Sequence, residues 1–102
     1  MSDSSTQQEC TTQTNLILET PKMVRVILFN DNYTTMEFVI EILQNIFAKT
    51  YDEAVQITFD IHKEGKGICG IYPYDIGEIK AQETALAAQK AQFPLKVSTE
   101  PI

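Results

Sequence analysis

The sequence has few basic side chains and no long apolar run, and these two shortages exclude several kinds of partner. There are 8 Lys and Arg residues against 14 Asp and Glu residues, so the formal net charge is −6. Because phosphate groups are bound by clustered Lys and Arg, we expect neither nucleic acid nor an anionic membrane surface as a partner. No run approaches the ~18 apolar residues that a membrane span needs. The N-terminus also lacks the basic and apolar regions of a signal peptide, which predicts a cytoplasmic protein.

Cysteine and histidine are scarce as well. The two cysteines, Cys10 and Cys69, lie in neither a CxxC pair nor a His-rich cluster, so we expect no disulfide framework and no zinc site. The single histidine, His62, lies close to Cys69 in the chain, but no oxyanion-hole signature surrounds the pair. A Cys69–His62 hydrolase is therefore the weakest interpretation. Phosphate-loop, HExxH and GxSxG motifs are missing too, and the sequence predicts no enzyme, no metal and no cofactor.

The chain divides into a polar extension and one small domain. Met1 to Asn15 consists almost entirely of Ser, Thr, Gln, Asp, Glu and Cys, and it cannot bury enough apolar surface to offset the entropy of ordering. Leu16 to Leu18 interrupts this run, which we interpret as a loosely docked linker. Pro21 marks the boundary. We therefore predict a flexible extension over residues 1–22 and a folded core over residues 23–102.

The first half of the core predicts one strand and two helices. Val24 to Phe29 is apolar and rich in β-branched residues, as in a buried strand. Two capping boxes then mark helix starts. The second helix is expected to end near Gly65, a residue typical of helix C-termini. The boxes are Thr34 with Glu37, which starts a helix near Thr35, and Thr50 with Glu53, which places Ala54, Ile57, Thr58 and Ile61 on one face.

The second half of the core completes the order β-α-α-β-α-β. Lys66 to Tyr72 predicts a strand whose two glycines indicate a bulge or a close backbone approach. Pro73 opens a third helix that runs to about Ala91. Phe93 to Thr99 alternates, with Leu95 directed inward, and closes the sheet. The fold class is α+β, a small three-stranded antiparallel sheet with three helices packed on it.

A polar loop after the first strand carries the candidate site. Asn30, Asp31 and Asn32 follow the strand directly and precede an apolar helix face that includes Met36 and Val39. An α-ammonium group has three N–H donors and no acceptor, so an Asn carbonyl oxygen, a carboxylate or a neutral histidine ring can accept from it. Polar acceptors beside an apolar pocket suit a ligand with a cationic head and an apolar side chain. The free N-terminal residue of a polypeptide is such a ligand.

At these residues the chain resembles the ClpS adaptors, which serve the ATP-dependent Clp protease in the bacterial N-end rule. The matching segments are VILFNDNYTTMEFVIEIL, IHKEGKGICGIY, EIKA and PLKVSTE, and the resemblance covers about residues 23–100. It implies a non-enzymatic adaptor for substrates whose first residue is Leu, Phe, Tyr or Trp. Such adaptors deliver these N-degron substrates to the N-terminal domain of a Clp-family AAA+ ATPase, ClpA-like or ClpC-like. We expect a monomer.

The resemblance also implies roles for individual residues and for the extension, which family members use in handing over substrate. The α-amino group would be bound by Asn30, Asn32 and His62, with Asp31 adjacent. The side-chain pocket would be lined by Thr34, Met36, Val39, Thr58, Ile61 and Leu95, with Met36 excluding β-branched first residues. The ATPase would dock at Tyr33, Asp75 and Lys80.

Three positions depart from the family pattern. Asn32 stands where a second Asp is usual, so one negative charge near the ammonium group is missing. Thr35 replaces a usual Pro, which loosens the helix start slightly. Thr58 replaces a larger apolar residue, which widens the pocket or makes it more polar.

A protein-docking module without a small-ligand pocket is the alternative interpretation. The small mixed fold also resembles the C-terminal domain of the ribosomal stalk protein, and fold alone does not decide function. The two interpretations differ in one property. An N-degron adaptor requires a free N-terminal residue on its ligand, whereas a docking module does not.

Overall fold

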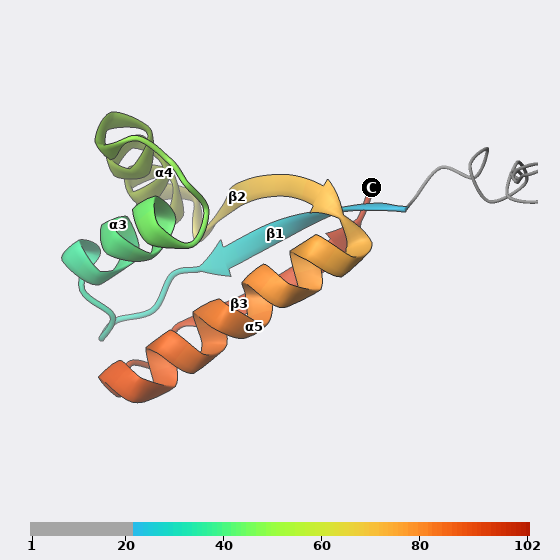
Figure 1. Ribbon diagram of the computed structural model, residues 1–102. Helices are drawn as coiled ribbons and strands as arrows, with labels where there is room; N and C mark the ends of the chain where they lie inside the picture. Colours follow the sequence, from blue (N-terminus) through green and yellow to red (C-terminus); the bar gives the residue numbers. More distant parts are fainter. Residues whose placement is uncertain (1–21) are drawn as a thin grey trace, which may run out of the picture.

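The computed structural model describes residues 22–102, which form one sheet and three helices in the predicted order (Figure 1). The elements are β1 (Met23–Phe29), α3 (Met36–Asn45), α4 (Tyr51–Glu64), β2 (Lys66–Pro73), α5 (Tyr74–Ala91) and β3 (Lys96–Pro101). The α+β prediction is confirmed for this part of the chain. The predicted extension, with Cys10 and Leu16 to Leu18, lies outside the described residues except for Lys22. Within residues 22–102, no helix is long and apolar enough to cross a bilayer.

The sheet is antiparallel, with β1 as the central strand in the order β2-β1-β3. Val24, Val26 and Leu28 alternate along β1 and are almost fully buried. Alternate residues of a strand point to the same face, so these three define the inner face, which the helices cover. The outer face carries Arg25, which lies 3.8 Å from the Glu100 carboxylate of β3. This pair is partly exposed and contributes little to stability.

A β-bulge at Cys69 confirms the irregularity that the two glycines of β2 predict. The register between β1 and β2 skips Cys69, because Val26 pairs with Gly70 and Ile27 pairs with Ile68. The Cys69 side chain is fully buried, and this burial raises the pKa of the thiol to about 12. Because the thiolate is the reactive form of cysteine, the hydrolase interpretation loses its nucleophile.

The helices lie in two places relative to the sheet. α5 lies along the inner face, whereas α3 and α4 form a pair beyond the end where β1 stops (Figure 1). Gly77 marks a close approach of α5 to β1, since a Cβ atom there would overlap the Val24 side chain. This contact explains a glycine that costs about 1 kcal/mol relative to Ala inside a helix. The core consists of Val26, Leu28, Val39, Ile42, Leu43, Phe47, Ala54, Ile61, Cys69, Ala88 and Leu95.

The start and end of α4 follow the sequence pattern. Thr50 and Glu53 form the predicted capping box, with hydrogen bonds of 3.1 Å and 2.9 Å in the two directions. Gly65 ends the helix with a φ of 90°, a left-handed conformation that glycine adopts without the strain of a Cβ atom. α4 is therefore fixed at both ends by local interactions.

The start of α3 differs from the prediction. The expected capping box of Thr34 with Glu37 is wrong, because Thr35 is the N-cap and accepts a hydrogen bond from the Phe38 N–H. The Thr34 backbone N–H, from which the Glu37 side chain would accept in a capping box, donates to Asp31 instead, and the Thr34 hydroxyl donates to the same carboxylate. The helix nevertheless begins only one residue after the predicted position, because Thr35 acts as the N-cap instead of Thr34.

The last strand also begins later than predicted, at Lys96 instead of Phe93. Phe93 follows the C-cap of α5, where its backbone N–H donates to the Ala88 carbonyl oxygen, and its ring packs against Phe38 of α3 with 5.0 Å between centroids. Pro94 has no N–H to donate to a strand partner. Leu95 is buried, as the alternation predicts, although it lies before the strand instead of within it.

Candidate functional site

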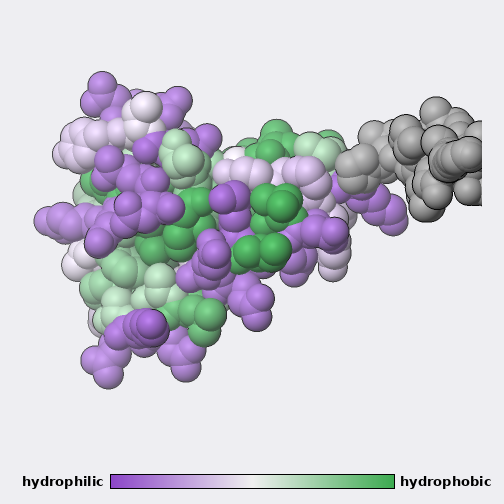
Figure 2. Space-filling view, viewed as in Figure 1, coloured by the Kyte–Doolittle hydropathy of each residue, from purple (hydrophilic) through white to green (hydrophobic). Residues whose placement is uncertain are grey.

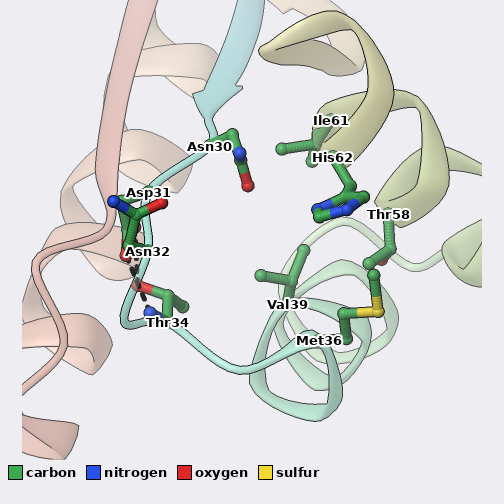
Figure 3. A pocket seen from close by; sticks show the side chains of 9 residues that line it. All are labelled: Asn30, Asp31, Asn32, Thr34, Met36, Val39, Thr58, Ile61 and His62. Atoms are coloured by element: carbon green, nitrogen blue, oxygen red, sulfur yellow. Dashed lines mark hydrogen bonds between the residues drawn. The ribbon is translucent and has the colours of Figure 1, made fainter.

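The β1–α3 loop, the first turn of α3 and the C-terminal half of α4 enclose a cavity of about 260 Å³ (Figure 3). Its walls are Asn30, Asp31, Asn32, Thr34, Met36, Val39, Thr58, Ile61 and His62. The sequence assigned all nine to one ligand site, and the fold brings them together from three separate elements. The structure does not bring Leu95 to this cavity, because that side chain packs in the core ahead of β3.

Asp31 folds the loop back on itself. Its Oδ1 atom accepts hydrogen bonds from the backbone N–H groups of Tyr33 at 2.8 Å and Thr34 at 2.7 Å, and Oδ2 accepts from the Thr34 hydroxyl at 2.7 Å. Partial burial alone would raise the pKa of the Asp31 carboxyl, but these hydrogen bonds outweigh it and lower the pKa below its ordinary value. A negative charge is therefore fixed in the cavity wall at neutral pH.

Asn30 and His62 form the polar end of the cavity. The Asn30 backbone N–H donates to the Gly65 carbonyl oxygen at 2.9 Å, which ties the end of β1 to the C-terminus of α4. Because His62 belongs to the last turn of α4, this bond holds both side chains at the same end of the cavity, into which they point (Figure 3). The Asn30 carbonyl oxygen and a neutral His62 ring can both accept hydrogen bonds. Asn32 is exposed beside them.

The other end of the cavity is mostly apolar. Val39 and Thr58 are less than a tenth exposed, and so is Ile61, which continues the apolar wall to the side of Asn30 and His62 (Figure 3). Met36 is 40% exposed, so it stands between the cavity and solvent, and its side chain extends toward Thr58 (Figure 3). Methionine is unbranched and adaptable, which suits a wall that must adjust to its occupant.

The three predicted ATPase-docking residues have different surroundings. Tyr33 is 75% exposed in the β1–α3 loop, and Asp75 is exposed in the first turn of α5. Lys80 is half-buried, because its Nζ donates to the Ile46 carbonyl oxygen at 2.8 Å and lies 5.3 Å from the Tyr72 ring centroid. Lys80 thus fastens α5 to the C-terminus of α3. No local pattern could reveal this role, since the donor and the acceptor are distant in the chain.

Hydrophobic side chains gather on the surface over β2 and the first part of α5 (Figure 2). Ile76 and Ile79 of α5 are about half exposed, and Ile71 of β2 is exposed on the outer face of the sheet, where it pairs with Arg25. Asp75 lies in the same stretch of α5. An apolar surface bordered by charged residues is typical of contact with another protein.

The fold and the cavity together define a small α+β binding domain. Its pocket combines hydrogen-bond acceptors and one fixed negative charge with apolar walls. This chemistry matches a ligand that carries a cationic head next to an apolar side chain.

Comparison with known proteins gives the family. Residues 19–98 match the family described as "ATP-dependent Clp protease adaptor protein ClpS". The chain is 52% identical over 89 residues to the "ATP-dependent Clp protease adapter protein ClpS" of Helicobacter hepaticus, which covers 87% of this chain and 90% of that relative. It is 58% identical over 81 residues to the protein of the same name from Clostridium acetobutylicum, with coverages of 79% and 80%.

A solved structure agrees with these relatives. The structure of Agrobacterium tumefaciens ClpS2 bound to L-phenylalaninamide is similar to this chain with a TM-score of 0.79 and 35% identity. The similarity covers 81% of this chain and 100% of that one. The chain belongs to the ClpS family. It is therefore an adaptor of the Clp protease system and not an enzyme.

Replacing Asp31 tests its part in the loop. Asp31→Asn removes the charge and leaves the Thr34 hydroxyl without a second carboxylate oxygen, so the free energy of unfolding should fall by about 1–2 kcal/mol at pH 7. Because the pKa of Asp31 is lowered in the folded state, its stabilisation is present above the ordinary value of 3.8 and is lost as the pH falls through the folded value. Urea unfolding of both proteins from pH 7 to pH 3 should show the difference narrowing in acid.

Glu41→Gln is the matched control, since Glu41 is an exposed carboxylate on α3. It should change stability by less than about 0.5 kcal/mol. A stability difference between Asp31→Asn and the parent protein that stays constant down to pH 3 would show that the carboxylate does not organise the loop.

Proposed function

We propose that the chain binds the free N-terminal residue of other polypeptides, where that residue is Leu, Phe, Tyr or Trp, and delivers them to the N-terminal domain of a Clp-family ATPase. The observation that carries this proposal is a cavity with acceptors at one end and buried apolar walls at the other. An α-ammonium group and a side chain leave the same carbon atom, so a first residue can engage both ends at once. The similar ClpS2 binds L-phenylalaninamide, a ligand with a free amine and an aromatic side chain.

The polar end would receive the α-ammonium group. Its three N–H donors match the Asn30 carbonyl oxygen, the Asn32 carbonyl oxygen and a neutral His62 ring. Hydrogen bonds to a charged group contribute about 1.5–3 kcal/mol each. The Asp31 charge adds a longer-range attraction, because its oxygens already hold the loop. Acetylation of the substrate would remove both the charge and the donors.

The apolar end would receive the side chain of the first residue. Burial of a Leu or Phe side chain contributes about 1.5–3 kcal/mol. Together with two or three charge-assisted bonds, and less the cost of association, this gives an affinity in the micromolar range, about −8 kcal/mol. Met36 would stand at the entrance, where a second heavy atom on the Cβ of Val or Ile meets it.

Delivery would use surfaces away from the cavity. Exposed Tyr33 and Asp75 are available to the ATPase domain, and the apolar side chains of α5 extend the Asp75 surface. Lys80 would contribute mainly by holding α5 against α3, since its ammonium group already has a partner within the chain. The residues of the extension, if fully extended, would reach about 70 Å, far enough to enter an ATPase pore while the core holds substrate. Such an adaptor would act in the cytoplasm as a monomer.

Substitution at the polar end tests the proposal. Asn30→Ala and His62→Ala should each weaken binding to a peptide with a free N-terminal Leu by at least about tenfold, because each removes an acceptor for the ammonium group. Fluorescence anisotropy with a labelled peptide measures the affinity.

Lys63→Ala is the matched control, since Lys63 is the exposed neighbour of His62 and does not line the cavity. It should bind the Leu peptide as the parent protein does. If Asn30→Ala and His62→Ala also bind normally, the ammonium group is held elsewhere.

Substitution at the entrance tests the exclusion of β-branched residues. Met36→Ala should admit peptides that begin with Val or Ile and bring their affinity within about tenfold of that for Leu, because the truncated side chain leaves room beside Cβ. Competition against the labelled Leu peptide measures the ratio. Continued exclusion of Val and Ile by this variant would assign the discrimination to another wall residue.

A further inference from the structure

Thr58 is a buried polar residue in the apolar half of the cavity. Its side chain is 4% exposed, and its hydroxyl donates to the Ala54 carbonyl oxygen at 2.7 Å. A hydroxyl carries one donor and two acceptor lone pairs, so this bond uses the donor only. Among residues 22–102, no side-chain or backbone donor is found on the Thr58 oxygen. The cavity wall therefore contains a hydrogen-bond acceptor that the protein itself leaves unused.

The position of Thr58 is defined by the helix that carries it. Thr58 and His62 are four residues apart on α4, so they lie on the same side of the helix about 6 Å apart along its axis. Figure 3 shows the His62 ring between Asn30 and Thr58, and Thr58 beside the tip of Met36. A ligand whose amine lies between Asn30 and His62 would therefore direct the far end of its side chain toward Thr58.

We propose that the Thr58 hydroxyl oxygen accepts a hydrogen bond from the far end of the bound first residue, so that the pocket favours Tyr and Trp over Phe. This inference rests on the proposed function, because it assigns a preference within the same site. The Tyr hydroxyl and the Trp indole N–H are donors at the tip of a long aromatic side chain, whereas Phe has none. Phe would leave this buried acceptor unpaired, which disfavours Phe relative to Tyr and Trp.

The hydroxyl of Thr58 also has a local role within its own helix. Thr often donates to the carbonyl oxygen four residues earlier in a helix, and this satisfies its proton without any ligand. That bond leaves the acceptor lone pairs free, however, and it fixes the oxygen in place. The donor of a ligand then meets an acceptor that does not need to reorient.

A comparison of two peptides and three proteins tests the preference. The peptides begin with free-amine Tyr or Phe and differ only in the phenolic hydroxyl. The proteins are the parent chain, Thr58→Val, which replaces the hydroxyl by a methyl group, and Thr58→Ser, which keeps the hydroxyl. Isothermal titration calorimetry gives the ratio of Tyr to Phe affinity for each protein, and thermal unfolding confirms that the variants fold.

The ratio should fall about three- to tenfold in Thr58→Val relative to the parent protein, and it should stay within about twofold of the parent value in Thr58→Ser. An equal ratio in the parent protein and Thr58→Val would overturn the inference. A fall of the same size in Thr58→Ser would also overturn it, because shape and not the hydroxyl would then be responsible. Binding of a free-amine Leu peptide to the parent protein tests the proposed site separately from the preference for Tyr. If this peptide binds, the site stands whatever the ratio shows, and if no free-amine peptide binds, the proposed function itself fails.

Discussion

The hydrogen bond from the Asn30 backbone N–H to the Gly65 carbonyl oxygen is the contact on which the site depends. It joins Asn30, the residue after β1, to Gly65, the residue that ends α4, with 2.9 Å between the nitrogen and the oxygen. Gly65 can take part because its φ of 90° turns the chain sharply after the helix, a conformation that favours glycine. The bond continues the β1–β2 pairing, in which Phe29 lies opposite Lys66, and it places Asn30 beside the end of the helix that carries His62. The polar end of the cavity is therefore positioned by backbone instead of by mobile side chains.

The charged groups of Asp31 and Lys80 hold parts of the structure together, and the neutral groups at the polar end of the cavity would contact the proposed ligand. The Asp31 carboxylate is occupied by two backbone N–H groups and one hydroxyl of its own loop. The Lys80 ammonium is occupied by the C-terminal carbonyl of α3. Among the described residues, the side chains of Asn30, Asn32 and His62 have no such hydrogen-bond partner. They can therefore present acceptors to an incoming amine. The missing carboxylate at Asn32 makes this division sharper, since a single fixed charge, that of Asp31, remains in the cavity wall.

Local patterns predicted much of the fold, and side-chain hydrogen bonds within the loop and between elements account for the failures. The capping box at Thr50 and the glycine at residue 65 predicted both ends of α4, because short-range hydrogen bonds and backbone geometry decide them. The capping box at Thr34 failed because Asp31 competes for the same groups, and an Asp three residues before a Thr could have indicated this turn. The anchoring of Lys80 on Ile46 joins distant parts of the chain, and sequence spacing cannot reveal it. The wall residues of the loop and of α3, apart from Thr34, followed from the local pattern, whereas those of α4 came from resemblance to a family, since no local pattern places α4 beside the loop.

In this account, one cavity binds both the amine and the side chain of a substrate's first residue. The most direct measurement is the affinity of four labelled peptides that begin with Leu or Val, each with a free or an acetylated amine. The account predicts micromolar binding of the free-amine Leu peptide and at least about tenfold weaker binding of the other three, because each lacks the charge, the fit or both. Equal binding of the free and acetylated Leu peptides would contradict the account and favour a docking module that ignores the N-terminus.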